Sequence, residues 1–124
     1  MSAAGPIAIL VTGEPVPDVR ARSGSFAAMI ARTVGDAWPH GFVSFDVREA
    51  EGRDALARLP TPPAALIITG SAAHVPAREP WILACEALLR PLVARGVPTL
   101  GLCFGHQLLA QALGGEVAAN PAGR

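Results

Sequence analysis

Lysine is absent from this 124-residue sequence, and its ten arginines balance ten acidic residues, so the formal net charge at pH 7 is zero. Without an excess or a cluster of basic residues, nothing points to nucleic acid or to an anionic membrane surface as a partner. We attribute the use of arginine in place of lysine to a GC-rich genome rather than to function.

Long hydrophobic runs are also absent, although 51% of the residues are hydrophobic and the mean hydropathy is +0.39. Prolines, arginines and glycines interrupt every apolar segment before it reaches the ~18 residues that a membrane span needs. The first residues, Met1 to Pro6, lack the basic start of a secretory signal peptide. We therefore expect a cytoplasmic protein, with room for one domain.

Cysteine is scarce, and Cys85 and Cys103 are the only two. Their separation does not match a zinc site, and a structural disulfide is not expected in a cytosolic chain, so both are predicted to be thiols. A phosphate-binding loop of the form G-x-x-x-x-G-K-[ST] is missing as well. We expect neither a metal ion nor a cofactor.

The apolar segments alternate between strand and helix patterns. Strands are predicted over residues 7–11, 41–47, 64–69, 97–100 and 116–118, and residues 12–22 are predicted to form a loop. Helices are predicted from Ser23 or Ser25 to Val34, over 54–59, from Pro80 to Gly96 with a kink or break at Pro91, and over 107–113. This alternation predicts an α/β fold with a doubly wound parallel sheet, in which ligands bind beyond the carboxyl ends of the strands.

Cys103 follows one such strand end, within Gly101-Leu102-Cys103-Phe104-Gly105. Small neighbours allow a sharp turn from strand to helix that projects a nucleophile clear of the sheet, and the helix N-terminus favours thiolate. An isolated cysteine can instead be a small core residue, but the glycines at this junction favour a catalytic nucleophile. Cys85 falls on the apolar face of a helix, and we expect it in the core.

Two backbone N–H groups are candidates for stabilising an oxyanion. One belongs to Phe104, and the other lies in the Gly70-Ser71 turn, which could also be an ordinary turn. No histidine is a clear base. His106 is expected to point away along its helix, and the loop residues His40 and His74 are expected to be solvated and incidental, respectively.

The cysteine turn matches the G-x-C-x-G-x-Q signature of the class I (triad) glutamine amidotransferases. The string from Pro98 to Ala110, continued by Ala112 to Gly115, resembles those enzymes, as do Ile67 to Ser71 with Val75 and Pro80-Trp81, and Asn120 to Gly123. The resemblance is strongest from Ala65 to Arg124. It is closest to stand-alone proteins similar to the amidotransferase domain of GMP synthetase.

This resemblance implies a flavodoxin-like sheet and a glutaminase mechanism. Cys103 would attack the side-chain amide of glutamine, and the N–H groups of Phe104 and Gly70 would hold the oxyanion. Gln107, Ser71 and Gly105 would bind the substrate. Any synthetase that accepts the ammonia would be another chain.

The family's catalytic histidine and acid lie downstream of the cysteine, and no His-x-Glu element is found here. We therefore expect residues 1–124 to be the N-terminal part of a single amidotransferase-like domain, with self-association through its uncovered apolar faces. The alternative is a truncated or degenerate relative that acts as a non-catalytic binding module. Another acyl substrate, as in related proteases, is the weaker possibility.

Overall fold

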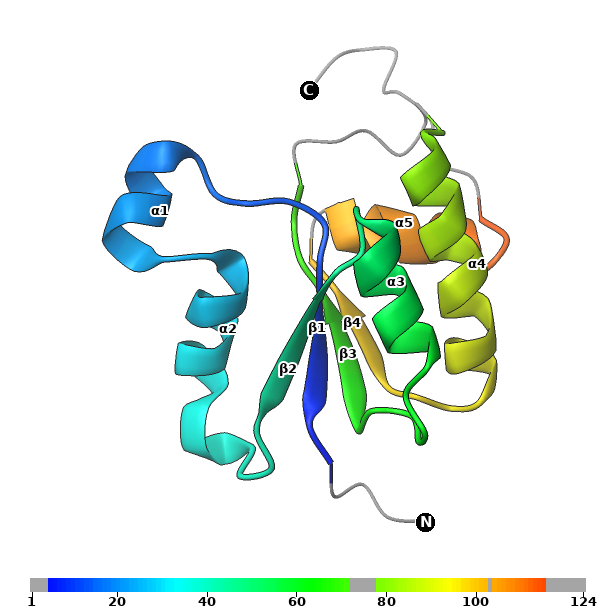
Figure 1. The fold of residues 1–124 in the computed structure, drawn as a ribbon, viewed down its shortest axis with the longest axis horizontal. Coiled ribbons are helices and arrows are strands. Elements are labelled where there is room, and N and C mark those ends of the chain that lie inside the picture. The colour runs from blue at the N-terminus through cyan, green and yellow to red at the C-terminus, as the bar shows by residue number, and fades with distance from the viewer. Residues whose placement is uncertain (1–4, 72–77, 103, 116–124) are drawn as a thin grey trace.

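The computed structural model describes residues 5–71, 78–102 and 104–115. Its centre is a four-stranded parallel sheet in the order β2-β1-β3-β4 (Figure 1). The strands are β1 (Ile7–Val11), β2 (Phe42–Asp46), β3 (Ala65–Ile68) and β4 (Thr99–Gly101). These strands confirm the predicted parallel α/β fold, and the strand predicted over 116–118 lies outside the described residues.

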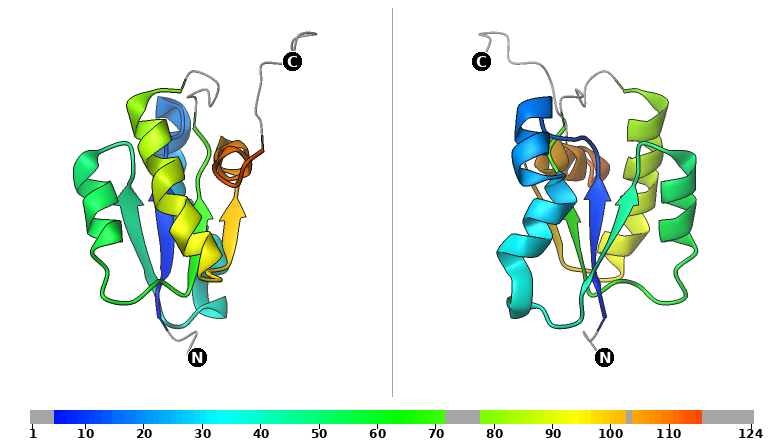
Figure 2. Two further views of the ribbon diagram at one scale, coloured as in Figure 1. Left: turned by 90° about the vertical axis from the view of Figure 1, so that its right-hand side faces the viewer. Right: turned by 60° about the vertical axis from the view of Figure 1, so that its left-hand side comes forward.

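Helices cover both faces of the sheet, as predicted for a doubly wound fold (Figure 2). On one side lie α1 (Pro17–Ser23) and α2 (Phe26–Val34), with a short 3₁₀ turn, η1 (Gly35–Ala37), continuing α2. On the other side lie α3 (Ala50–Ala57) and α4 (Pro80–Ala94), and α5 (Phe104–Ala112) packs against α4 and β4.

The main core lies on the side of α3, α4 and α5. All five residues of β1 are buried, because this strand is central and covered on both faces. The core residues come from the strands and these three helices: Ala8, Leu10, Phe45, Leu66, Ile68, Leu56, Ile82, Cys85, Leu89, Phe104, Leu108 and Ala112 are among them.

The opposite face of the sheet is less completely covered. Between α2 and the β4 edge lies an apolar groove of about 270 Å³, lined by residues that include Met29, Ile30 and Ile67. Leu100 and Leu102 also line it and are 55% and 38% exposed. This groove is an incompletely covered apolar surface on the described part of the chain.

The loop predicted over 12–22 is wrong from residue 17 onward, where α1 begins. Pro17 occupies the first helical turn, Asp18 follows it there, and Arg20 and Arg22 lie in the last turn. A proline with a suitable φ, an acid near the helix N-terminus and basic residues near its C-terminus all stabilise a short helix. The prolines and glycine of this segment had indicated a loop because they also mark turns.

Three other helices differ from their predicted limits. α3 begins at Ala50 rather than at residue 54, and α5 begins at Phe104, directly after Cys103, rather than at residue 107. α4 runs unbroken through Pro91, so the predicted split of this helix is wrong, while the alternative of a kink stays a prediction. Because proline has no N–H, the Ala87 carbonyl, four residues before Pro91, has no hydrogen-bond donor within the helix. Pro91 and Ala87 are both exposed, so water can donate to this carbonyl instead.

Two helix signals in the sequence are confirmed. The Ser25 side chain caps α2 by accepting a hydrogen bond from the Ala28 N–H, and Pro80 occupies the first turn of α4. Within the described ranges, none of the helices has the length and apolar character needed to span a bilayer.

Candidate functional site

The described residues on either side of Cys103 form a tight strand-to-helix junction. β4 ends at Gly101 and α5 begins at Phe104. A Cβ atom on Gly101 would lie 2.6 Å from the backbone of Gly105, and one on Gly105 would lie 2.5 Å from the Ile68 carbonyl oxygen. The backbone approaches both positions so closely that only glycine fits there. This explains why the G-x-C-x-G motif has glycine at these two positions.

This junction lies against the carboxyl end of β3. The Leu102 N–H donates to the Ile68 carbonyl at 3.0 Å, and Gly105 contacts the same residue. Gly70 comes two residues after Ile68, so the two predicted oxyanion donors, Gly70 and Phe104, belong to neighbouring segments. Cys103 itself lies outside the described residues.

Phe104 is held firmly as the first residue of α5. Its side chain is 3% exposed and its ring lies 5.8 Å from that of Trp81, centroid to centroid. The first N–H groups of a helix have no partner within the helix, so α5 itself does not use the N–H of Phe104. Gln107, one turn further along α5, is exposed, whereas Gly105 is buried.

The Gly70-Ser71 turn rests on the end of β1. A Cβ atom on Gly13 would lie 2.8 Å from the Ser71 Cα and 3.1 Å from the Gly70 carbonyl oxygen. Thr12 and Thr69, both fully buried, join the ends of β1 and β3 through their hydroxyl groups. This pair was not predicted from the sequence, although a threonine follows each of two apolar strands.

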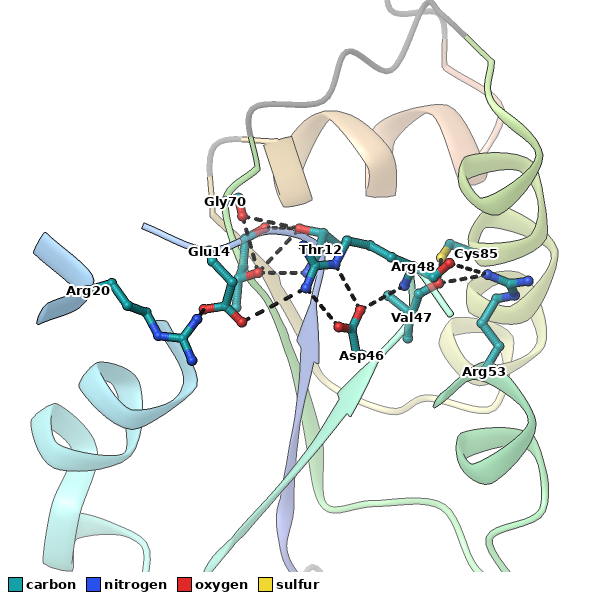
Figure 3. A network of polar contacts seen from close by, with 10 residues as sticks. Thr12, Glu14, Arg20, Asp46, Val47, Arg48, Arg53, Gly70 and Cys85 are labelled. Atoms are coloured by element: carbon teal, nitrogen blue, oxygen red, sulfur yellow. Dashed lines mark hydrogen bonds and ion pairs between the residues drawn. The ribbon is translucent and has the colours of Figure 1, made fainter. Parts of the chain in front are cut away.

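A cluster of charged side chains follows the ends of β1 and β2 (Figure 3). Arg48 binds Asp46 through two hydrogen bonds of 2.9 and 2.7 Å and lies 3.9 Å from Glu14, which also pairs with Arg20 at 3.2 Å. The hydrogen bond from Arg48 lowers the pKa of Asp46 below its usual 3.8. The same pairing raises the pKa of Arg48.

Cys85 is a core thiol, as predicted. It is 1% exposed on α4, and its Sγ donates to the Val47 carbonyl at 3.3 Å. Burial raises its pKa to about 12, chiefly because desolvation penalises the thiolate. At pH 8 a thiol of that pKa is ionised in only about one molecule in ten thousand, so it is a poor nucleophile.

Of the two described histidines, His106 lies near the junction and His40 does not. His40 is exposed and precedes β2, so it lies at the amino ends of the strands. The junction of β4 and α5 lies at the opposite, carboxyl ends. His106 is exposed on α5, consistent with a side chain directed away from the core. His74 lies outside the described residues. Over the ranges that the structure describes, no group of histidine, cysteine and acidic residues is arranged to hold a metal ion.

Glu86 is a further residue that the sequence analysis missed. It is 1% exposed on the buried side of α4, where its two carboxylate oxygens accept from Arg78 at 2.6 and 3.1 Å. Arg90, 3.8 Å from the same carboxylate, donates to the Ala112 carbonyl at the end of α5. A glutamate within the apolar stripe of a helix was the available signal.

Comparison with known proteins agrees with this geometry. The sequence model of the glutamine amidotransferase class-I family matches residues 25–123. A glutamine-hydrolyzing GMP synthase of Streptomyces coelicolor is 33% identical over 120 residues, covering 94% of this chain and 20% of the relative. The corresponding enzyme of Parafrankia sp. is 39% identical over 94 residues, or 75% of this chain and 16% of the relative.

A third relative carries a different name. Gamma-glutamyl peptidase 4 of Arabidopsis thaliana is 40% identical over 52 residues, covering 42% of this chain and 21% of the relative. The matches span from 10% to 25% of the length of these and similar relatives. No solved structure matches the chain. With a family match over most of its length and a parallel sheet that ends in the expected strand-to-helix junction, the chain belongs to the class-I glutamine amidotransferase family.

Proposed function

We propose that Cys103 is the nucleophile of a site that cleaves the side-chain amide of glutamine. The observation that supports this most strongly is the junction of β4 and α5, where Gly101 and Gly105 permit no Cβ atom. Such packing is needed to turn a strand sharply into a helix at a nucleophile. Phe104 at the start of α5 and Gly70 at the end of β3 are the proposed oxyanion donors.

The proposed reaction proceeds in two acyl transfers. A base takes the thiol proton of Cys103, and the sulfur adds to the amide carbon of glutamine to give a tetrahedral oxyanion. As the carbon–nitrogen bond breaks, the nitrogen takes up a proton and leaves as ammonia. Water then adds to the γ-glutamyl thioester, which releases glutamate and restores the thiol. Gln107, Ser71 and Gly105 are the proposed substrate-binding residues.

We propose that the base and its acidic partner come from residues other than those described here. His40 lies at the wrong end of the sheet, and His106 is exposed on α5. On this proposal residues 1–124 form the nucleophile-bearing part of one amidotransferase domain, and an ammonia-accepting synthetase would be a separate partner. Without the base, ionisation of Cys103 relies on the N-terminus of α5.

The test is alkylation by a glutamine-derived chloroketone, which presents the γ-glutamyl group with a carbonyl where the amide would lie. We expect Cys103 to be labelled much faster than Cys85, and free glutamine to slow this labelling. Cys103→Ser should abolish it, and the matched variant Cys85→Ser should not. Slow and equal labelling of both thiols would overturn the proposal and favour a non-catalytic binding module.

A γ-glutamyl peptide is the second candidate substrate, favoured by the likeness to the Arabidopsis gamma-glutamyl peptidase. The acyl group and the thioester would be the same, and only the leaving group would differ. Competition by glutamine and by a γ-glutamyl dipeptide in the same labelling assay distinguishes the two. Stronger protection by the dipeptide would assign the site to peptides.

A further inference from the structure

The carboxyl ends of β1 and β3 meet at the point where the strand order of the sheet reverses. From β1 the chain proceeds to β2 on one side, whereas β3 and β4 lie on the other. In open α/β sheets ligands bind in the crevice at such a switch point. Thr12 and Thr69 are the first residues after these two strands.

Hydrogen bonds of Thr12 hold the peptide that joins Thr69 to Gly70. The Thr12 hydroxyl donates to the Thr69 carbonyl at 2.8 Å, and the Thr12 N–H donates to the Thr69 hydroxyl at 2.9 Å. Both side chains are fully buried. Polar groups removed from water are held tightly by such bonds, since losing one leaves a buried group unsatisfied.

The direction of the Gly70 N–H follows from this arrangement. The Thr69 carbonyl and the Gly70 N–H belong to one planar trans peptide and point in opposite directions. The carbonyl points to Thr12 on the β1 side, as does the Thr69 N–H, which donates to the Leu10 carbonyl at 3.0 Å. The Gly70 N–H therefore points to the β4 side, where Leu102 already binds the Ile68 carbonyl.

We propose that Thr12 is a positioning residue that orients the Thr69–Gly70 peptide so that the Gly70 N–H faces the start of α5. Gly13 also contributes, because without a Cβ atom it allows the backbone of Ser71 to pack closely against the end of β1. A hydrogen bond to the carbonyl also polarises the peptide and strengthens its N–H as a donor. The catalytic part of this inference rests on the proposed function.

The test uses two matched substitutions in the full chain. Thr12→Val keeps the shape of the side chain and removes its hydroxyl, whereas Thr12→Ser keeps the hydroxyl. Labelling rates of Cys103 are measured with two alkylating reagents. In the glutamine-derived chloroketone the sulfur displaces chloride beside a carbonyl that the γ-glutamyl group places at the oxyanion donors. In iodoacetamide the sulfur displaces iodide, and no γ-glutamyl group places the carbonyl there. Thr33→Val, which removes a hydroxyl bound to the Met29 carbonyl on α2, is the control.

We expect Thr12→Val to slow chloroketone labelling about tenfold while iodoacetamide labelling changes less than about twofold. This is a fraction of the ~10²–10³ lost when an oxyanion donor is removed outright. Thr12→Ser should restore the rate, and Thr33→Val should not change it. The inference is overturned if the ratio of the chloroketone rate to the iodoacetamide rate is unchanged in Thr12→Val, or if Thr12→Ser lowers that ratio as much as Thr12→Val does.

A second measurement separates this inference from the proposed function. The ¹³C shift of the Thr69 carbonyl and the amide shift of Gly70 report the orientation of the peptide without any labelling reagent. Both should move in Thr12→Val and return in Thr12→Ser. If wild-type Cys103 shows no preference for the chloroketone, the glutaminase proposal fails, while these shifts still decide whether Thr12 orients the peptide. Unchanged shifts in Thr12→Val would refute that orientation.

Discussion

Removing Arg78 should destabilise the fold more than removing any ordinary surface arginine, because it leaves the Glu86 carboxylate buried without its main partner. Glu86 is 1% exposed, and Arg78 holds both of its oxygens, at 2.6 and 3.1 Å. Arg90 remains, at 3.8 Å. Breaking a buried ion pair from one side costs about 3–5 kcal/mol.

The expected loss for Arg78→Met is about 2–3 kcal/mol, below that range because Arg78 is 39% exposed and Arg90 still offsets part of the charge. Urea unfolding measures this loss. With a slope of about 1–3 kcal/mol/M, the urea concentration at the midpoint should fall by roughly 0.7–3 M. Arg58→Met removes an exposed arginine at the end of α3 and serves as the control, with an expected change within about 0.5 kcal/mol.

The double variant Arg78→Met with Glu86→Met decides whether the buried charge is the cause. Replacing both members of a buried pair by apolar residues is often neutral, so the double variant should be more stable than Arg78→Met alone. If Arg78→Met costs no more than Arg58→Met, or if the double variant loses the sum of the two single losses, the reasoning is refuted.

Three further predictions concern other parts of the fold. Gly105→Ala should lower the free energy of unfolding by about 1–3 kcal/mol through overpacking against Ile68, despite a gain in helix propensity of up to ~1 kcal/mol, as measured by urea unfolding. Because Arg48 lowers the pKa of Asp46 in the folded state, this pair stabilises the fold above about pH 4, and the benefit is lost as pH falls through the folded pKa. The stability difference between wild type and Asp46→Asn should therefore shrink on acidification in a pH series of unfolding curves. Leu100→Arg should raise the concentration at which the chain self-associates, as measured by sedimentation, because it charges the apolar groove beside α2.

Each of these three has a result that contradicts it. Gly5→Ala, where no atom lies within 4 Å of the added Cβ, should be neutral, and an equal loss there would remove the packing argument for Gly105. A pH-independent difference for Asp46→Asn would mean that Arg48 does not hold the carboxyl. Unchanged sedimentation of Leu100→Arg would mean that the groove does not mediate association.

The positions and parallel arrangement of the strands could be predicted from the sequence because they are short apolar or alternating runs bounded by turn residues. Residues 7–11 and 66–68 are buried, and continuous apolar runs are typical of central parallel strands. Helix limits were less accurate, since Pro17 and Pro91 favour a turn in isolation but are tolerated where they stand. Pro91 is tolerated because it is exposed to solvent, and the local sequence does not show which residues of a helix will be exposed.

The sequence by itself determined the candidate nucleophile, its flanking glycines and the family. Only the tertiary structure decided what the glycines accommodate, because the Ile68 carbonyl that Gly105 meets lies more than thirty positions earlier in the chain. The same holds for Thr12 and Thr69, which are separated by 57 positions. Local patterns report which residues are apolar or turn-forming, whereas hydrogen bonds between strand ends form only after the sheet has aligned them.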